Sequence, residues 1–158
     1  MISVDFGDLD DPAIVALLKV HLETARAATA PGSAHALDLA GLKVPGIAFF
    51  AARDKTSLCG VAALKRLDGE DGELKSMHVV ATARRKGVGS ALILHIISHA
   101  QRIGLERLWL ETGSWDYFHP ARALYARHGF VACEAFGDYR PDRHSVFMMR
   151  GLSLQGRR

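Results

Sequence analysis

The most informative stretch of the chain runs from Glu73 to Ser90 and reads ELKSMHVVATARRKGVGS. Its first half, Glu73–Val80, is predicted to form a strand, although its mix of apolar and polar residues is unusual. Three consecutive cations follow at 84–86, and from Gly87 to Ile103 the chain has the length and the apolar periodicity of a helix. The stretch therefore predicts a strand, a basic loop and a long helix.

The start of this helix is suited to binding an anion. The first N–H groups of a helix have no intrahelical acceptor, and the helix dipole makes that end positive. Gly87 and Gly89 carry no side chains that would hold a ligand away, and Arg84, Arg85 and Lys86 add positive charge. The chain has no GxxxxGK[ST] motif, and the loop lacks the third glycine of GxGxxG. We expect a pyrophosphate site here.

Further elements are predicted on both sides of this stretch. Asp11-Pro12 is a typical helix start, and apolar residues then recur at helical spacing to about Thr29. Another helix should run from Pro120 to Gly129, and a short one should cover His35–Leu39. The expected strands are Val4–Phe6, Ile47–Arg53, Leu58–Leu67, Arg107–Glu111, Phe130–Ala135 and Ser145–Leu152.

This order of elements predicts a mixed α/β fold. Strands that follow one another through tight turns favour a largely antiparallel twisted sheet, and the strand–helix–strand unit in the middle favours one βαβ crossover with flanking helices. The length of 158 residues suits a single domain, 1–158.

Composition excludes several classes of protein. Apolar residues make up 49% and charged residues 23%, which excludes a disordered or collagen-like chain. Apolar runs are too short to span a bilayer, and the N-terminus does not resemble a signal peptide, so we expect a cytoplasmic protein without a membrane partner. The net charge of +3 is small for a nucleic-acid-binding protein.

Cysteine and histidine usage suggests neither a disulfide nor a metal site. Cys59 and Cys133 each stand alone in apolar surroundings and are expected to be small buried residues. His95 and His99 have the i, i+4 spacing of metal ligands but fall at the edge of the helix's apolar face, so we interpret them as ordinary rim residues.

Two motifs resemble those of the GCN5-related N-acetyltransferase (GNAT) family. The segment Arg84-Arg-Lys-Gly-Val-Gly89 matches the family's [QR]xxGxG signature between a strand and a helix, and Ala123-Leu-Tyr-Ala-Arg-His-Gly-Phe130 resembles its helix ending in LYxxxGF. The strand Arg107-Leu-Trp-Leu-Glu-Thr112 lies between them, as the fifth strand does in the family. The resemblance covers about residues 47–150 and implies the GNAT fold, with acetyl-CoA as the acetyl donor.

The resemblance also implies a set of donor-binding residues. The acyl group would lie where the fourth and fifth strands separate, next to backbone groups of Met77, His78 and Val79, with an N–H near Val79 polarising the thioester carbonyl. Thr112 would lie near the pantetheine arm. The pyrophosphate would rest on the segment Arg84, Arg85, Lys86, Gly87, Val88, Gly89 and Ser90.

Two catalytic residues are expected from the same comparison. Tyr125 aligns with the family tyrosine that contacts the CoA sulfur, and a phenol is a suitable acid toward a thiolate. The alternative is a tyrosine that packs with its hydroxyl in water. Glu73 lies where some members of the family place a general base, but it could instead be a surface carboxylate paired with a cation. Glu111 and Asp116 are competing candidates.

The acceptor is not indicated by the sequence. The expected activity is acetyl transfer from acetyl-CoA to a primary amine of a small molecule or a peptide, and homodimers are common in the family. The alternatives are a non-catalytic acyl-CoA-binding regulatory module and, less in keeping with the dispersed acids, a nucleic-acid-binding domain using the basic loop and the tail Arg157-Arg158.

Overall fold

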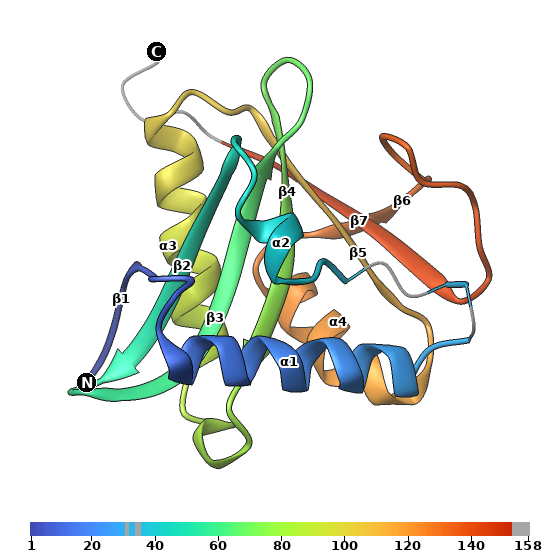
Figure 1. The fold of residues 1–158 in the computed structure, drawn as a ribbon. Coiled ribbons are helices and arrows are strands. Elements are labelled where there is room, and N and C mark those ends of the chain that lie inside the picture. Colours follow the sequence, from blue (N-terminus) through green and yellow to red (C-terminus); the bar gives the residue numbers. More distant parts are fainter. Residues whose placement is uncertain (31, 34–35, 153–158) are drawn as a thin grey trace.

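The computed structural model describes residues 1–30, 32–33 and 36–152 (Figure 1). Its elements follow in the order β1 (Ile2–Phe6), α1 (Pro12–Ala27), α2 (Leu39–Leu42), β2 (Ile47–Asp54), β3 (Ser57–Arg66), β4 (Asp71–Val79), α3 (Val88–Arg102), β5 (Arg107–Gly113), α4 (His119–Arg127), β6 (Val131–Cys133) and β7 (Ser145–Gly151). Short 3₁₀ turns at Ala81–Ala83 and Asp116–Phe118, which the sequence did not indicate, precede α3 and α4.

The described strands form one sheet in the order β1-β2-β3-β4-β5-β7-β6. Neighbouring strands are antiparallel except β4 and β5, which are parallel and joined by α3. The mixed α/β fold with a central crossover, predicted from the order of elements, is thereby confirmed. The last strand in the chain, β7, is inserted between β5 and β6, so β6 forms one edge of the sheet and β1 the other.

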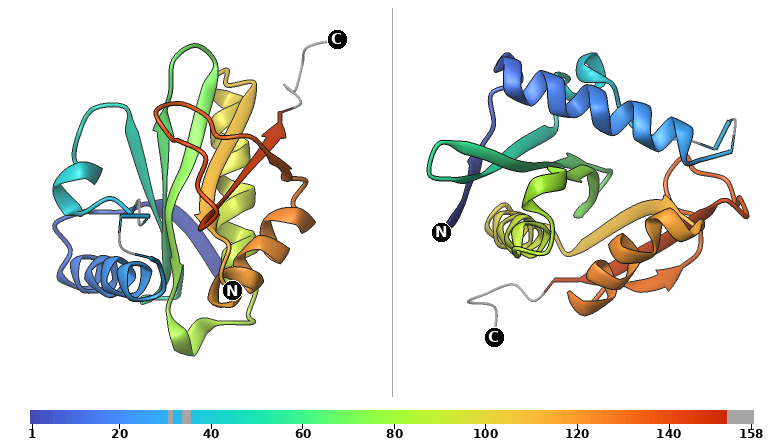
Figure 2. Two further views of the ribbon diagram at one scale, coloured as in Figure 1. Left: turned by 90° about the vertical axis from the view of Figure 1, so that its right-hand side faces the viewer. Right: turned by 90° about the horizontal axis from the view of Figure 1, so that it is seen from below.

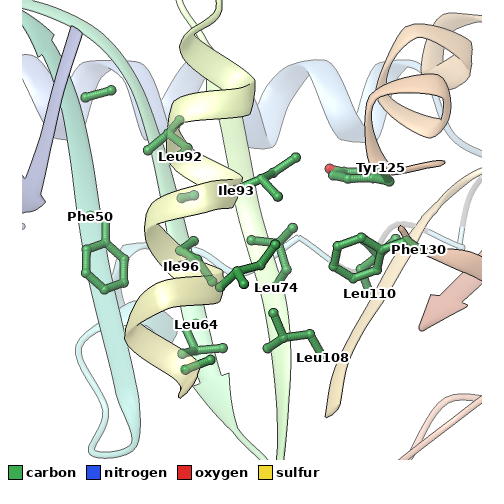
Figure 3. Packing of buried hydrophobic residues seen from close by; sticks show 14 of the residues in the cluster. Phe50, Leu64, Leu74, Leu92, Ile93, Ile96, Leu108, Leu110, Tyr125 and Phe130 are labelled. Carbon is green, nitrogen blue, oxygen red and sulfur yellow. The ribbon is translucent and has the colours of Figure 1, made fainter. Parts of the chain in front are cut away.

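Helices cover both faces of the sheet (Figure 2). The adjacent residues Phe49 and Phe50 on β2 point to opposite faces, and each belongs to a different hydrophobic core. The face covered by α1 and α2 buries Ile14, Leu18, Leu42, Phe49 and Val61. The face covered by α3 and α4 buries Phe50, Leu64, Leu74, Leu92, Ile93, Ile96, Leu108, Leu110, Tyr125 and Phe130 (Figure 3).

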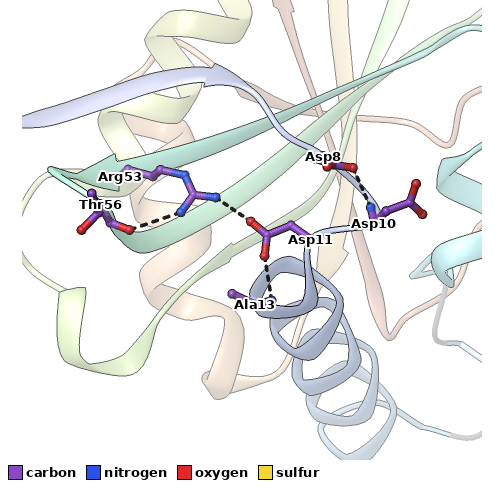
Figure 4. Close-up of polar contacts among 6 residues, drawn as sticks. All are labelled: Asp8, Asp10, Asp11, Ala13, Arg53 and Thr56. Atoms are coloured by element: carbon purple, nitrogen blue, oxygen red, sulfur yellow. Dashed lines mark hydrogen bonds and ion pairs between the residues drawn. The ribbon is translucent and has the colours of Figure 1, made fainter.

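One side chain both starts α1 and ties it to the sheet (Figure 4). A carboxylate oxygen of Asp11 accepts a hydrogen bond from the N–H of Ala13 at 2.9 Å, as expected for an N-cap residue. The other oxygen accepts from Nη2 of Arg53 on β2 at 3.0 Å. The predicted Asp-Pro start is therefore confirmed, and the helix is fixed at its N-terminus so that it runs across β3 and β4.

The short helix expected at His35–Leu39 is misplaced. The helix α2 begins at Leu39, because the side chain of Asp38 accepts a hydrogen bond from the N–H of Gly41 at 2.9 Å and caps it there. Residues 36–38 are not helical, and His35 lies outside the described residues, as do Pro31 and the tail Arg157-Arg158. Cys59 is buried as expected, but Cys133 is only partly buried. Within the described ranges, no helix has the length and apolar character needed to cross a bilayer.

Candidate active site

The parallel strands β4 and β5 separate shortly after they meet. They pair only through the first three residues of β4, Asp71–Glu73. Farther along, β4 has a bulge relative to β3. Lys75 and His78 are three residues apart on β4, but their partners on β3 are only two residues apart, and Ser76 adopts a φ of +56°. A bulge bends a strand and redirects its groups. The two strands therefore form a V that opens from Glu73 onward.

One backbone N–H of β4 points into this V. The N–H of Val80 donates to the carbonyl oxygen of Cys59 on β3 at 2.8 Å. Successive N–H groups of a strand point to opposite edges, so the N–H of Val79 is directed toward the gap between β4 and β5. This is the orientation required to donate a hydrogen bond to a carbonyl placed in the gap.

A cleft of about 620 Å³ occupies the gap and extends along the start of α3, the C-terminal half of α1 and the inner side of α4. Among the described residues, it brings together thirteen candidates named from the sequence: Glu73, Met77, His78, Val79, Arg84, Arg85, Gly87, Val88, Gly89, Ser90, Glu111, Thr112 and Tyr125. Lys86, also predicted, is exposed on the same loop and does not line the cleft in the described part of the chain.

The basic loop forms one end of the cleft. Gly87 caps α3 with a left-handed φ of +81°, and the N–H of Ala91 donates to its carbonyl oxygen at 3.0 Å. The N–H groups before Ala91 therefore face out of the first turn of the helix. Arg84 and Arg85 flank this end, so the predicted combination of helix N-terminus and positive charge is present.

Gly89 has a packing role that the sequence did not indicate. A Cβ atom at this position would lie 2.7 Å from Cδ2 of Leu124 on α4. The absence of a side chain therefore allows α3 and α4 to pack closely, in addition to leaving room for a ligand. A second contact joins the same two helices: Nε2 of His128 lies 2.9 Å from Oγ of Ser90.

The carboxylate of Glu73 is buried and has two side-chain partners. It is 3% exposed, and its Oε2 accepts a hydrogen bond from Oη of Tyr139 at 2.5 Å and an ion-pair contact from Nζ of Lys75 at 3.2 Å. Lys75 also donates to Oη of Tyr139 at 2.9 Å. The three side chains contact one another in a closed, partly buried ring, and Tyr139 comes from the loop between β6 and β7. Nothing in the sequence marked this partner.

Glu111 and Tyr125 both line the cleft. Burial raises the pKa of Glu111 to about 7, although the nearby Lys75 lowers it in part. Tyr125 is 8% exposed, and burial together with the charge of Glu111 raises its pKa well above the usual range. In Figure 3 its ring lies beside Phe130 and its hydroxyl end points toward α3. The ring is therefore buried in the wall of the cleft, with its hydroxyl end directed toward α3.

Two histidines meet at the α1 side of the cleft. Nδ1 of His21 on α1 lies 3.1 Å from Nδ1 of His78 on β4. Burial lowers the pKa of His21 to about 4, with a further contribution from His78, and burial and Arg84 lower the pKa of His78. Both imidazoles are then neutral at pH 7, which allows one ring to donate to the other. This contact holds α1 against the bulged end of β4.

The remaining candidates lie outside the cleft or at its mouth. Asp116 is exposed and does not line the cleft in the described ranges. Tyr117 and Phe118, which follow β5, do line it. His95 and His99 pack edge-on against Phe50, and no cluster of three or more metal-ligating side chains is found among the described residues.

Comparison with known proteins agrees with this arrangement. The model of the acetyltransferase (GNAT) family matches residues 16–130. The chain belongs to this family. It is 44% identical to the uncharacterized N-acetyltransferase YsnE of Bacillus subtilis over 149 residues, which is 94% of this chain and 99% of YsnE. It is 41% identical to the uncharacterized N-acetyltransferase YedL of Escherichia coli, over 94% of this chain and 93% of YedL.

The fold also matches solved structures of GNAT proteins. An acetyltransferase from Bacillus subtilis in complex with CoA superposes with a TM-score of 0.73 over 97% of this chain and 100% of that one, at 18% identity. The family membership predicted from the two motifs is therefore confirmed, and this GNAT protein is an acyltransferase.

Proposed function

We propose that the protein transfers an acetyl group from acetyl-CoA to a primary amine of a small molecule or a peptide, by direct attack of the amine on the thioester. One observation carries this proposal: the V between β4 and β5 and the N-terminus of α3 belong to one continuous cleft. A donor with a pyrophosphate at one end and an acyl carbonyl at the other needs both sites in line.

The cleft has groups that suit such a donor. The first-turn N–H groups of α3, with Arg84 and Arg85, would bind the pyrophosphate. Oγ of Ser76 is buried at the bulge and has no hydrogen-bond partner within the described structure, and Ser76 lines the cleft. A buried hydroxyl without a partner is uncommon and is explained if a ligand contacts it. The CoA bound to the B. subtilis acetyltransferase supports the same assignment.

Acetyl-CoA supplies an acyl carbonyl that is activated by its thioester. The N–H of Val79 would donate to the carbonyl oxygen and stabilise negative charge as it develops there. Glu111 would take a proton from the incoming ammonium group, because a carboxylate with a pKa of about 7 is half ionised at neutral pH and can both accept and release a proton. Glu73, held by Lys75 and Tyr139, remains the alternative base.

Tyr125 would protonate the departing sulfur. The charge of Glu111 contributes to the raised pKa of Tyr125, so protonation of Glu111 by the amine makes Tyr125 a stronger acid. The protons balance: the ammonium loses one to Glu111, Tyr125 gives one to the thiolate, the nitrogen that becomes the amide returns one to Tyr125, and Glu111 finally releases its proton to solvent. Proton transfer from the amine to Glu111 therefore favours the later proton transfer from Tyr125 to the sulfur.

The direct test follows release of free CoA thiol from acetyl-CoA with a panel of amines, with mass spectrometry of the products. We expect release that depends on an amine, together with an acetylated product. A non-catalytic acyl-CoA-binding module would give a different result: at 100 times its dissociation constant the donor would stabilise the fold by about 2.7 kcal/mol, but no amine would promote release.

A further inference from the structure

The contact between His128 and Ser90 lies directly behind the basic end of the cleft. Ser90 is in the first turn of α3 and lines the cleft, whereas His128 follows the last turn of α4 and is not among the described lining residues. Their side chains approach to 2.9 Å between Nε2 and Oγ. The imidazole therefore cannot act on a ligand directly, but it can act through the serine hydroxyl.

The direction of this hydrogen bond determines what Ser90 can offer to a ligand. A hydroxyl has one proton to donate and two lone pairs. If Nε2 of His128 carries no proton, the Ser90 hydroxyl donates to it and is lost as a donor to the cleft. If Nε2 carries a proton, the imidazole donates to Oγ and the hydroxyl proton is available for a phosphate oxygen. An imidazolium carries protons on both nitrogens, so it always enforces the second arrangement.

We propose that His128 is a positioning residue that turns the hydroxyl of Ser90 toward the pyrophosphate of the bound donor and takes up a proton when the donor binds. This inference rests on the proposed function, because it requires the basic end of the cleft to hold the donor's phosphates. Its consequence is that the donor binds more tightly at mildly acidic pH than at pH 8.

The charges around His128 support proton uptake on binding. Burial first, and then the guanidinium groups of Arg127 beside it and Arg150 on β7, lower its pKa. The loop cations Arg84 and Arg85 lie at the same end of the cleft. A bound pyrophosphate would offset this excess of positive charge and favour the imidazolium. The proton is then bound preferentially in the complex, so affinity increases as the pH falls.

The test measures binding of 3′-dephospho-CoA by calorimetry between pH 5.5 and 8. This probe keeps the pyrophosphate but lacks the phosphate monoester, whose second pKa near 6 would titrate in the same range. For each unit by which binding raises the histidine pKa, the affinity gains up to about tenfold at low pH. Titrations in two buffers of different ionisation enthalpy give the number of protons taken up.

The variant His128→Gln separates positioning from a merely structural role. Its amide N–H can still donate to Ser90 but it cannot titrate, so the gain in affinity and the proton uptake that His128 contributes at low pH should be lost. His95→Gln is the matched control, because His95 packs against Phe50 away from the cleft and should behave as wild type.

Equal pH dependence of wild type and His128→Gln would overturn the inference, and so would weakened binding of His128→Gln at every pH. Other groups in the cleft, such as Glu111, titrate in this range, but they do so in both proteins and cancel in the comparison. Absence of binding by the wild type at any pH would instead contradict the proposed function.

Discussion

The end of the cleft proposed to bind the pyrophosphate (the donor end) and the end proposed to bind the amine (the acceptor end) are formed in different ways. The donor end consists of consecutive residues, 84–90, that offer backbone N–H groups and positive charge at the start of one helix. The acceptor end is lined by side chains that converge from distant parts of the chain, His21 on α1, Glu73 on β4 and Glu111 on β5, and Tyr139 before β7 supports it by its hydrogen bond to Glu73. We therefore expect single substitutions to have larger effects at the acceptor end, where a single group performs each step.

The largest effect should come from Glu111→Gln. Removal of a general base typically costs 10²–10⁴-fold in kcat. In the wild type, kcat/KM should increase as the pH rises through about 7, where Glu111 becomes ionised, and this dependence should be absent from the variant. Steady-state kinetics between pH 5.5 and 9 measure both quantities.

The matched variant is Glu73→Gln, which changes the other carboxylate of the acceptor end. A greater loss of kcat in Glu73→Gln than in Glu111→Gln would assign the base to Glu73.

The fold of Glu111→Gln should be retained. Because the pKa of Glu111 is raised from 4.5 to about 7, the folded state binds more protons than the unfolded state across this interval, and stability falls as the pH rises through it. In Glu111→Gln the side chain is neutral at every pH, so this decrease in stability with rising pH should be absent.

Tyr125→Phe should have the next largest effect. The ring and its packing against Phe130 remain, while the hydroxyl that could meet the developing thiolate is lost. A hydrogen bond to a charged group contributes about 1.5–3 kcal/mol, so kcat and kcat/KM should fall together by roughly 10- to 100-fold. Acyl donors with a more acidic thiol should partly restore the rate. An increase in KM for acetyl-CoA alone would make Tyr125 a contact of the pantetheine arm instead.

The same contrast explains what the sequence could predict. The loop 84–90 was identified because its cations, its glycines and the helix that follows are contiguous, and the order of elements was sufficient for the mixed sheet with its crossover. A helix boundary that depends on one capping side chain was predicted wrongly. The helix α2 begins at Leu39 because the carboxylate of Asp38 caps it there.

The acceptor end could only be predicted in part. Glu73, Glu111 and Tyr125 were proposed from their places in strands and motifs, but their environments depend on contacts between distant residues. Tyr139 lies 66 positions from Glu73, and His21 lies 57 positions from His78. No pattern of neighbouring residues in the sequence predicts such contacts. The packing role of Gly89 was missed for the same reason, since its neighbour Leu124 belongs to another helix.

A smaller effect, on stability, is expected for Tyr139→Phe. This change removes the hydroxyl that donates to Glu73 and accepts from Lys75, leaving the buried carboxylate with one partner fewer. Loss of a hydrogen bond to a buried charged group costs about 1–3 kcal/mol, which denaturant unfolding would detect. Tyr117→Phe is the control, since Tyr117 is half exposed. If Tyr139→Phe unfolds like wild type but loses as much activity as Glu73→Gln, the cluster of Glu73, Lys75 and Tyr139 takes part in catalysis.

The smallest effect is expected at the donor end, for Arg84→Gln compared with Lys86→Gln. Both variants remove one positive charge from an exposed position on the same loop, but only Arg84 lines the cleft within the described structure. Exposed charge pairs contribute about 1 kcal/mol at most, so Arg84→Gln should weaken CoA binding by roughly fivefold at low salt, and the difference should shrink as salt screens the charge. Lys86→Gln should bind almost as wild type, because the backbone N–H groups of α3 are unchanged. Equal losses in the two variants would mean that the loop attracts the donor only through its overall charge, and a loss of a hundredfold or more for Arg84→Gln would show that the donor end also depends on one side chain.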